Sequence, residues 1–242
     1  MTPPDSMDEI LPRLWLGDIA GPQDAKTLEK RNIRAILSVL EFEIDIPEGI
    51  AHKHVQLIDT GEADLLGNVV PCIEFIQTEL DKGHSVLVHC FAGVSRSASM
   101  VTAYIMYSQN LSSADAMRQL QKARPIVSPN RSFVAQLDIF HQAITKVNTE
   151  SSTEEDKLKR LAVAVMAVMP TKEELNACVE KYWMQELSSS SETTQVQRTT
   201  VGGSQKGPEE GRDLVNTHPR RRFQRFASLF GFPLKSSSPG RE

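Results

Sequence analysis

The residues best suited to do chemistry lie in the stretch VHCFAGVSRSAS, residues 88–99. Cys90 follows an apolar run, and five residues separate it from Arg96. A thiol becomes a strong nucleophile only when it is ionised, and a helix N-terminus or a nearby cation favours the thiolate. The planar guanidinium of Arg96 suits two oxygens of a phosphate group. This spacing therefore indicates attack of a cysteine on a phosphate ester.

The residues between Cys90 and Arg96 can form a phosphate-binding loop. Their amide groups can point inward at the N-terminus of the following helix, which makes a site for an anion. Gly93 supplies a backbone angle that residues with a Cβ resist. A Walker loop is a different device, because it needs a Gly-Lys-Ser/Thr sequence that is absent here. We expect the loop to bind phosphate through Arg96 and the residues Phe91, Ala92, Gly93, Val94 and Ser95.

A cysteine after an apolar strand is more often a buried apolar residue than a nucleophile. That interpretation suits Cys72, which stands among apolar residues of a predicted helix, and Cys178 on a more polar helix. It is weak for Cys90, because His, Gly, Arg and Ser surround this residue at the required spacing. Three widely spaced cysteines form no disulfide framework and suit a reducing compartment.

Residues 10–147 alternate between predicted strands and helices. The apolar run at residues 85–89 does not alternate with polar residues, which is typical of a buried strand in a parallel sheet. The alternation predicts an α/β domain with a central, mostly parallel sheet flanked by helices. Strands are expected at 10–17, 34–40, 52–57 and 85–89, and helices at 24–31, 66–80, 97–109, 112–123 and 131–144.

The composition changes after residue 147. Two helices are predicted within 154–187, separated by Pro170, and residues 188–242 have the composition of a disordered tail. The basic and aromatic segment RRRFQRFASLFGF, residues 220–232, has several interpretations. It could contact a membrane surface as an amphipathic helix, bind a partner such as a kinase, or be phosphorylated at Ser228. The alternative is a basic end without a fixed partner.

The stretch HCFAGVSRS resembles the His-Cys-x5-Arg-Ser/Thr signature of the cysteine-based phosphatases. The flanking text resembles the dual-specificity phosphatases in particular, in ILPRLWLG at 10–17, AYIM at 103–106 and RPIVSPNRSFVAQL at 124–137. The resemblance implies a cysteine-phosphatase fold over residues 8–147 and an atypical member without a rhodanese-like domain. One departure is Ser132, where the family most often has Gly. We expect little effect from it, because Asn130 and Phe133 are kept.

The leaving oxygen of a phosphate ester needs a proton, which a carboxyl group on a separate loop can supply. The candidate stretch is LIDTGEADLL, residues 57–66. Asp59 follows a predicted strand directly, and the resemblance implies that it is the general acid. Asp64 is the alternative, and we interpret it instead as the cap of the helix that begins near Leu65.

The resemblance also implies supporting residues. Ser97 is expected to donate a hydrogen bond to the Cys90 sulfur, although it could be an ordinary residue of the first helical turn. His89 is expected to support the loop, and Asn130 either braces a neighbouring loop or caps a helix. No metal or cofactor is implied, and four histidines without ligand spacing are interpreted as ordinary residues: His52, His54, His84 and His141.

These residues predict the dephosphorylation of phosphotyrosine and phosphoserine/threonine in proteins through a phosphocysteine intermediate. The uncharged side chains of the loop disfavour phosphoinositides, and the net charge of −4 indicates no nucleic-acid partner. The other class of function is a phosphoprotein-binding scaffold, which the presence of Cys90, Arg96 and Asp59 disfavours. The N-terminus lacks the apolar region of a signal peptide, so we expect a cytoplasmic or nuclear protein.

Overall fold

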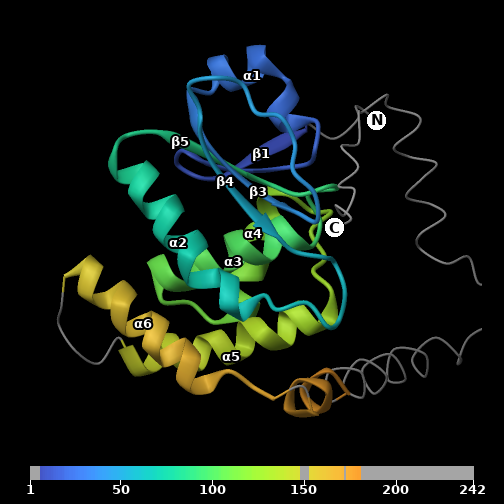
Figure 1. Cartoon of the computed structure of the whole chain (residues 1–242), viewed down its shortest axis with the longest axis vertical. Coiled ribbons are helices and arrows are strands. Elements are labelled where there is room, and N and C mark those ends of the chain that lie inside the picture. The colour runs from blue at the N-terminus through green and yellow to red at the C-terminus, as the bar shows by residue number, and fades with distance from the viewer. Residues whose placement is uncertain (1–5, 148–152, 172, 181–242) are drawn as a thin grey trace, which may run out of the picture. The chain divides into compact units, whose positions relative to one another are not determined.

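The computed structural model describes residues 6–147, 153–171 and 173–180. Five strands form one sheet, with helices on both of its faces (Figure 1). A single 3-10 turn, η1 (Gly21–Gln23), precedes the first α-helix. The strands are β1 (Met7–Leu11), β2 (Leu14–Gly17), β3 (Ile33–Leu40), β4 (Ala51–Gln56) and β5 (Ser85–His89). The helices are α1 (Ala25–Lys30), α2 (Leu66–Asp81), α3 (Arg96–Gln109), α4 (Ser113–Ala123), α5 (Arg131–Val147) and α6 (Glu154–Val168).

The sheet has the strand order β1-β2-β5-β3-β4 and is mostly parallel, as predicted. Only the β1–β2 pair is antiparallel among these strands. Strand β5 lies in the middle, and all of its residues are buried. The carboxyl ends of parallel strands meet at one edge of a sheet, where ligands usually bind. Residues that follow β5 and β4 are therefore brought to the same edge.

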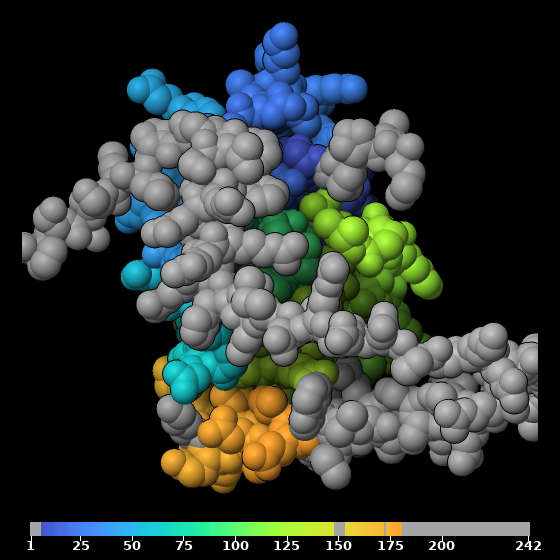
Figure 2. All heavy atoms as spheres, turned by 90° about the vertical axis from the view of Figure 1, so that its right-hand side faces the viewer, coloured from blue at the N-terminus to red at the C-terminus, as the bar shows by residue number. Residues whose placement is uncertain are grey.

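The two faces of the sheet bury different apolar clusters. Val86 and Val88 of β5 face the larger cluster, which helices α2 to α6 complete. Leu87 points to the opposite face and packs with Leu28 of α1. Helices α1 and α6 consequently lie on opposite sides of the sheet (Figures 1 and 2). Because β5 is buried on both faces, the residues in its middle, Val86 to Val88, are all apolar.

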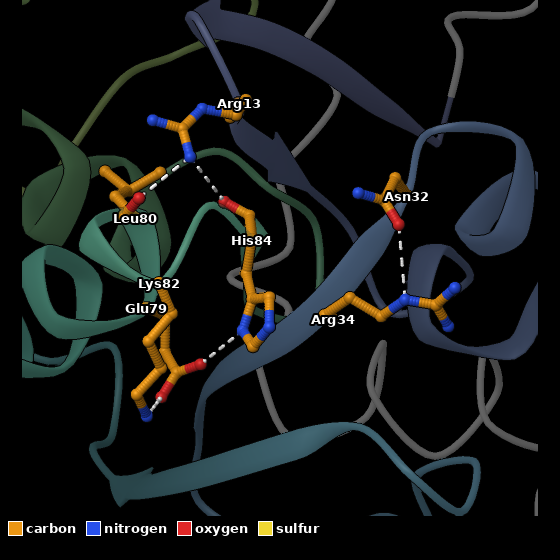
Figure 3. A network of polar contacts seen from close by, with 7 residues as sticks. All are labelled: Arg13, Asn32, Arg34, Glu79, Leu80, Lys82 and His84. Carbon is orange, nitrogen blue, oxygen red and sulfur yellow. Dashed lines mark hydrogen bonds and ion pairs between the residues drawn. The ribbon is translucent and has the colours of Figure 1, made fainter.

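The stretch at residues 10–17 was predicted as one strand, and this prediction is wrong. Residues 12 and 13 form a tight turn between β1 and β2, in which Arg13 adopts a left-handed conformation with φ of 68°. The Arg13 guanidinium donates hydrogen bonds to the carbonyl oxygens of Leu80 (2.8 Å) and His84 (3.5 Å) (Figure 3). In the same region, buried Glu79 pairs with Lys82 and His84. The turn is thus tied to the end of α2.

Helix α6 packs on the larger apolar cluster through Leu161 and Val165, which are both buried. The phenol of Tyr107 on α3 donates a 2.6 Å hydrogen bond to Glu154 at the start of α6. Residues 173–180 are also helical, so that helices lie on both sides of Pro170, and the rest of the second predicted helix, up to residue 187, lies outside the described residues. Among the described residues, no helix is long and apolar enough to cross a membrane. The predicted tail at 188–242 lies outside them.

Candidate active site

Cys90 lies directly after β5, at the edge where the parallel strands end, and its residue is only 2 % exposed. Residues 90–96, here called the signature loop, lead from β5 into α3. The loop contains every residue predicted to bind phosphate: Phe91, Ala92, Gly93, Val94, Ser95 and Arg96. Cys90 N–H donates to the carbonyl oxygen of Gly17 at 3.4 Å, which ties the start of the loop to β2.

The carbonyl groups of the signature loop are bound by groups outside it. Phe91 O accepts from Ile19 N (3.2 Å), and Val94 O accepts from Ser128 N (2.9 Å). Gly93 O accepts from Arg124 Nε (3.1 Å). The C=O and N–H of one trans peptide point in opposite directions. The amides that follow these carbonyls therefore point toward the inside of the loop, as an anion site requires.

Gly93 allows the signature loop to pass close to its neighbours. Its φ is +65°, and a Cβ built on it would lie 2.7 Å from Gly17 O and 2.8 Å from a guanidinium nitrogen of Arg124. Arg124 is itself buried and forms a 2.5 Å ion pair with Asp8 of β1. Any side chain at position 93 would displace the strand or this ion pair.

Substituting Gly93 by alanine should lower the free energy of unfolding by about 2 kcal/mol or more, because of the left-handed backbone and the contact with Gly17 O. Gly61→Ala is the matched control, since its Cβ would meet nothing within 4 Å. Urea titration of both variants measures the difference. Equal stability of the two variants would contradict the close packing around Gly93.

Ser97 and Arg96 complete the surroundings of the sulfur. Ser97 Oγ donates to Cys90 Sγ at 3.1 Å, in a position fully shielded from solvent. Arg96 donates from one terminal nitrogen to Leu57 O at 3.3 Å. Its Nε is buried without a partner in the part of the chain that the structure describes. A buried donor usually has an acceptor, and a phosphate oxygen in the signature loop would supply one.

Asp59 lies in the segment between β4 and α2, residues 57–65, here called the acid loop. Its Oδ1 accepts two hydrogen bonds of 2.7 Å, one from Ser95 Oγ and one from Asn130 Nδ2. Asn130 N–H donates to Ser95 Oγ at 3.1 Å, and Asn130 Oδ1 accepts from Phe133 N at the start of α5. Asn130 thus both caps a helix and braces the acid loop. Because Oδ1 is occupied, Oδ2 is the oxygen available for a proton.

Asp64 caps α2, as the sequence indicated. Its Oδ1 accepts from Gly67 N–H at 2.8 Å, which satisfies one of the free amides of the first helical turn. This carboxylate is therefore occupied by the helix backbone. The contact supports the assignment of Asp59, not Asp64, to acid catalysis.

Gln136 of α5 holds the far end of the acid loop and was not foreseen from the sequence. Its buried Oε1 accepts from Leu65 N (2.8 Å) and Leu66 N (3.1 Å). Its Nε2 donates to Ala63 O (2.9 Å) and to Ser132 Oγ (3.1 Å). Ser132, the residue that departs from the family pattern, therefore completes the hydrogen bonding of this amide. No local sequence feature signals the contact, because some 70 residues separate its partners.

His89 supports the signature loop from within the sheet, through contacts with Cys90 and Ser38. It is fully buried, its Nδ1 lies 3.3 Å from Cys90 O, and its Nε2 lies 2.7 Å from Ser38 Oγ of β3. Burial lowers the pKa of His89 to about 3, so that the imidazole is neutral at physiological pH. Ser38 is a second supporting residue that the sequence did not reveal.

The buried His89 should make stability depend on pH. The unfolded chain takes up a proton below about 6.5, whereas the folded protein does so only near 3. Above 6.5 both states are neutral; below it the unfolded state binds one more proton, so stability falls as the pH falls. Between pH 7.5 and 5, wild type should lose about 2 kcal/mol more than His89→Gln, by urea titration. Parallel pH profiles would contradict the buried neutral state.

The other two cysteines have different surroundings. Cys72 of α2 is buried in the apolar core, and burial raises its pKa to about 12. Cys178 is partly exposed, and both thiols are free. Within the described ranges, no group of three or more His, Cys, Asp or Glu residues is arranged to hold a metal ion.

The family model described as dual specificity phosphatase, catalytic domain, matches residues 14–143. The dual specificity protein phosphatase MPK-4 of Drosophila melanogaster is 33 % identical over 167 residues, which are 66 % of this chain and 42 % of the relative. The dual specificity protein phosphatase 15 of Homo sapiens is 33 % identical over 144 residues, 60 % of this chain and 49 % of the relative. The chain thus spans less than half the length of these two curated relatives.

Solved structures show the same fold. The crystal structure of DUSP15 matches with a TM-score of 0.57 and 29 % identity, and covers 68 % of this chain and 97 % of that one. The human tyrosine phosphatase-like serine/threonine/tyrosine-interacting protein matches with a TM-score of 0.55 and 29 % identity, over 60 % and 98 % of the two chains. The family model covers more than half of the chain, and its match includes Cys90, Arg96 and Asp59. The chain therefore belongs to the dual-specificity phosphatase family.

Proposed function

We propose that this protein removes phosphate from phosphotyrosine and phosphoserine/threonine in proteins. The observation that carries the proposal is the Ser97–Cys90 contact of 3.1 Å inside a loop whose carbonyls point outward. A hydroxyl aimed at a sulfur stabilises negative charge there, and inward amides bind a phosphate dianion. Together they suit a thiolate that attacks phosphorus.

In the first step, the Cys90 thiolate attacks phosphorus opposite the leaving oxygen. The S–P bond forms while the bond from phosphorus to the leaving oxygen breaks. Arg96 and the loop amides bind the three remaining phosphate oxygens, on which charge increases in the transition state. Asp59 transfers its proton from Oδ2 to the leaving oxygen, and a phosphocysteine is left.

In the second step, water cleaves the phosphocysteine. Asp59, now a carboxylate, accepts a proton from the water as its oxygen attacks phosphorus. The S–P bond breaks, and the sulfur leaves as a thiolate. The Ser97 hydroxyl stabilises that thiolate through its hydrogen bond and so makes sulfur a better leaving group. The enzyme returns to its initial protonation state.

The loop supports proteins as the substrate class. Phosphoinositides carry additional phosphate groups, which need cations near the loop, but the variable side chains Phe91, Ala92, Val94 and Ser95 are all uncharged. Ala92 is exposed, whereas Phe91 and Val94 are half-buried. These uncharged side chains, among which only Phe91 is large, accommodate both aryl and alkyl phosphates.

Binding without hydrolysis is the second candidate function. One of the similar structures is that of a human tyrosine phosphatase-like protein, which is named for an interaction, as a serine/threonine/tyrosine-interacting protein. The fold alone therefore does not separate an enzyme from a binding protein. The presence of Cys90, Arg96 and a braced Asp59 favours hydrolysis.

The test is phosphate release by the full chain in EDTA, from p-nitrophenyl phosphate and then from peptides with one phosphotyrosine, phosphoserine or phosphothreonine. We expect turnover of all three peptides and at least about 10-fold lower kcat/KM with soluble phosphoinositides. Faster hydrolysis of the phosphoinositides would overturn the substrate class. Tight peptide binding by folded protein without any turnover would establish the binding function instead.

We further propose that the protein acts in phosphorylation signalling in the cytoplasm or nucleus. A catalytic thiol works only while it is reduced, and those compartments keep thiols reduced. Contact of residues 220–232 with a kinase or a membrane surface also stays a proposal, since that segment lies outside the described residues. Imaging of a fluorescent fusion, with and without residues 220–242, tests both points. Exclusion of the fusion from both compartments would contradict the first. An unchanged distribution without residues 220–242 would contradict contact with a membrane surface.

A further inference from the structure

A chain of hydrogen-bonded side chains connects the surface of β4 with the signature loop. His52 of β4 lies with its Nε2 2.9 Å from Ser38 Oγ of β3, and that oxygen lies 2.7 Å from His89 Nε2 of β5. His89 Nδ1 then contacts Cys90 O at 3.3 Å. The three strands are adjacent in the sheet, and the middle and last side chains are fully buried. An exposed imidazole is thereby linked to the peptide that follows the nucleophile.

Only one direction of the hydrogen bonds satisfies both ends of the chain, the donor His52 and the acceptor Cys90 O. Cys90 O can only accept, so a neutral His89 carries its hydrogen on Nδ1 and its Nε2 is an acceptor. Ser38 must therefore donate its single hydroxyl hydrogen to His89. The Ser38 oxygen can then only accept from His52, whose Nε2 bears a hydrogen. The chain runs in one direction from His52 to Cys90.

This direction does not depend on the charge of His52. Burial and the nearby His54 lower the pKa of His52, while Glu43 after β3 acts in the opposite sense. His54 and Arg96 also lie close enough to act on His89. In the protonated imidazole both nitrogens carry hydrogen, and in the neutral form bound to Ser38 the hydrogen stays on Nε2. His52 is a donor in both states.

Removal of the donor at position 52 would leave the hydroxyl of Ser38 free to rotate. Ser38 could then accept a hydrogen from His89 Nε2, and His89 would lose the hydrogen on Nδ1 that holds Cys90 O. That carbonyl belongs to the peptide whose N–H, on Phe91, points toward the inside of the signature loop. A hydrogen bond to a carbonyl strengthens the donor at the other end of the same peptide.

We propose that His52 is a positioning residue of the phosphatase site: it fixes the Ser38 hydroxyl, so that His89 holds the Cys90–Phe91 peptide in its phosphate-binding orientation. The kinetic part of this inference rests on the proposed function, whereas the proton positions do not. His54 provides a matched control, because it lies on the same strand but hydrogen-bonds Leu40 O instead.

Long-range ¹H–¹⁵N spectra of the full chain with ¹⁵N-histidine report which nitrogen of His89 carries hydrogen. We expect Nδ1–H in wild type and in His54→Leu, and a mixture of both forms in His52→Leu. His52→Arg, which can only donate, should restore Nδ1–H. The kcat/KM for a phosphopeptide should fall about 3- to 10-fold in His52→Leu and recover in His52→Arg.

The outcomes separate this inference from the proposed function. Hydrogen on Nε2 of His89 in wild type would overturn the inference, and so would a His52→Leu variant with the wild-type tautomer. A mixture of tautomers with unchanged kcat/KM would overturn the positioning role. A wild type that carries Nδ1–H but turns over no substrate would contradict the proposed function alone, since the spectra need no substrate.

Discussion

Replacing Cys90 by serine should abolish turnover, with kcat for p-nitrophenyl phosphate at least about 10⁴-fold below wild type. A serine hydroxyl stays protonated at neutral pH, and His89 is not placed to accept its proton, since the His89 Nδ1 faces the Cys90 carbonyl. The signature loop, with Arg96 and its inward amides, is unchanged by the substitution. The variant should therefore still bind a phosphopeptide while releasing no phosphate.

Cys178→Ser is the matched control for this prediction, because it exchanges the same atoms at a partly exposed thiol that is not part of the signature loop. It should keep the wild-type kcat. Acid quench of wild type during turnover, followed by mass measurement, should reveal a phosphorylated enzyme that Cys90→Ser never forms. A kcat of Cys90→Ser within 10-fold of wild type would contradict a mechanism in which the cysteine attacks phosphorus.

The sequence predicted those elements that a short run of consecutive residues is enough to indicate. The apolar runs of β3 and β5 are each contained in a few consecutive residues, and the structure confirms the predicted strands. The β1–β2 hairpin was missed for the opposite reason. Its turn depends on Arg13 reaching carbonyl oxygens 67 and 71 residues away, which no local pattern reveals.

The same distinction applies to the site. Cys90, Ser97 and Arg96 lie within eight consecutive residues, so that their spacing alone indicates their proximity. The bracing of Asp59 by Ser95 and Asn130 joins residues 36 and 71 positions apart. These contacts follow from the strand order, which brings the ends of β4 and β5 to one edge of the sheet.

The hydrogen-bonded chain His52–Ser38–His89 shows most clearly what the sequence alone cannot predict. Interpreted from the sequence, His52 was an ordinary strand residue, because it has no ligand spacing. Its role depends on Ser38 of β3, the strand that lies between β4 and β5 in the sheet, and β5 is distant from both in sequence. Composition and periodicity describe how one strand is buried, but not which side chains meet across three strands.

Replacing Asp59 by alanine should slow the enzyme in a way that depends on the leaving group. Without the acid, the leaving oxygen departs unprotonated, which is hardest for the alkoxide of phosphoserine and easiest for p-nitrophenolate. We expect kcat/KM, which reports the steps up to phosphocysteine formation, to fall about 10²- to 10³-fold with phosphoserine or phosphotyrosine peptides, and much less with p-nitrophenyl phosphate. A series of aryl phosphates measures this as a steeper dependence of kcat/KM on the acidity of the leaving alcohol.

Asp64→Ala distinguishes this chemical role from a general effect of losing a carboxylate in the acid loop. Asp64 caps α2 through Gly67 N–H, so its loss should cost about 1 kcal/mol of stability and leave the dependence on the leaving group as in wild type. Ser95→Ala removes one of the two hydrogen bonds that orient Asp59, and should produce a smaller slowing with the same preference for good leaving groups. If Asp64→Ala steepens the dependence and Asp59→Ala does not, then the acid has been assigned to the wrong carboxylate. If neither does, the proton comes from a group outside this loop, and the bracing of Asp59 by Ser95 and Asn130 serves the conformation of the loop alone.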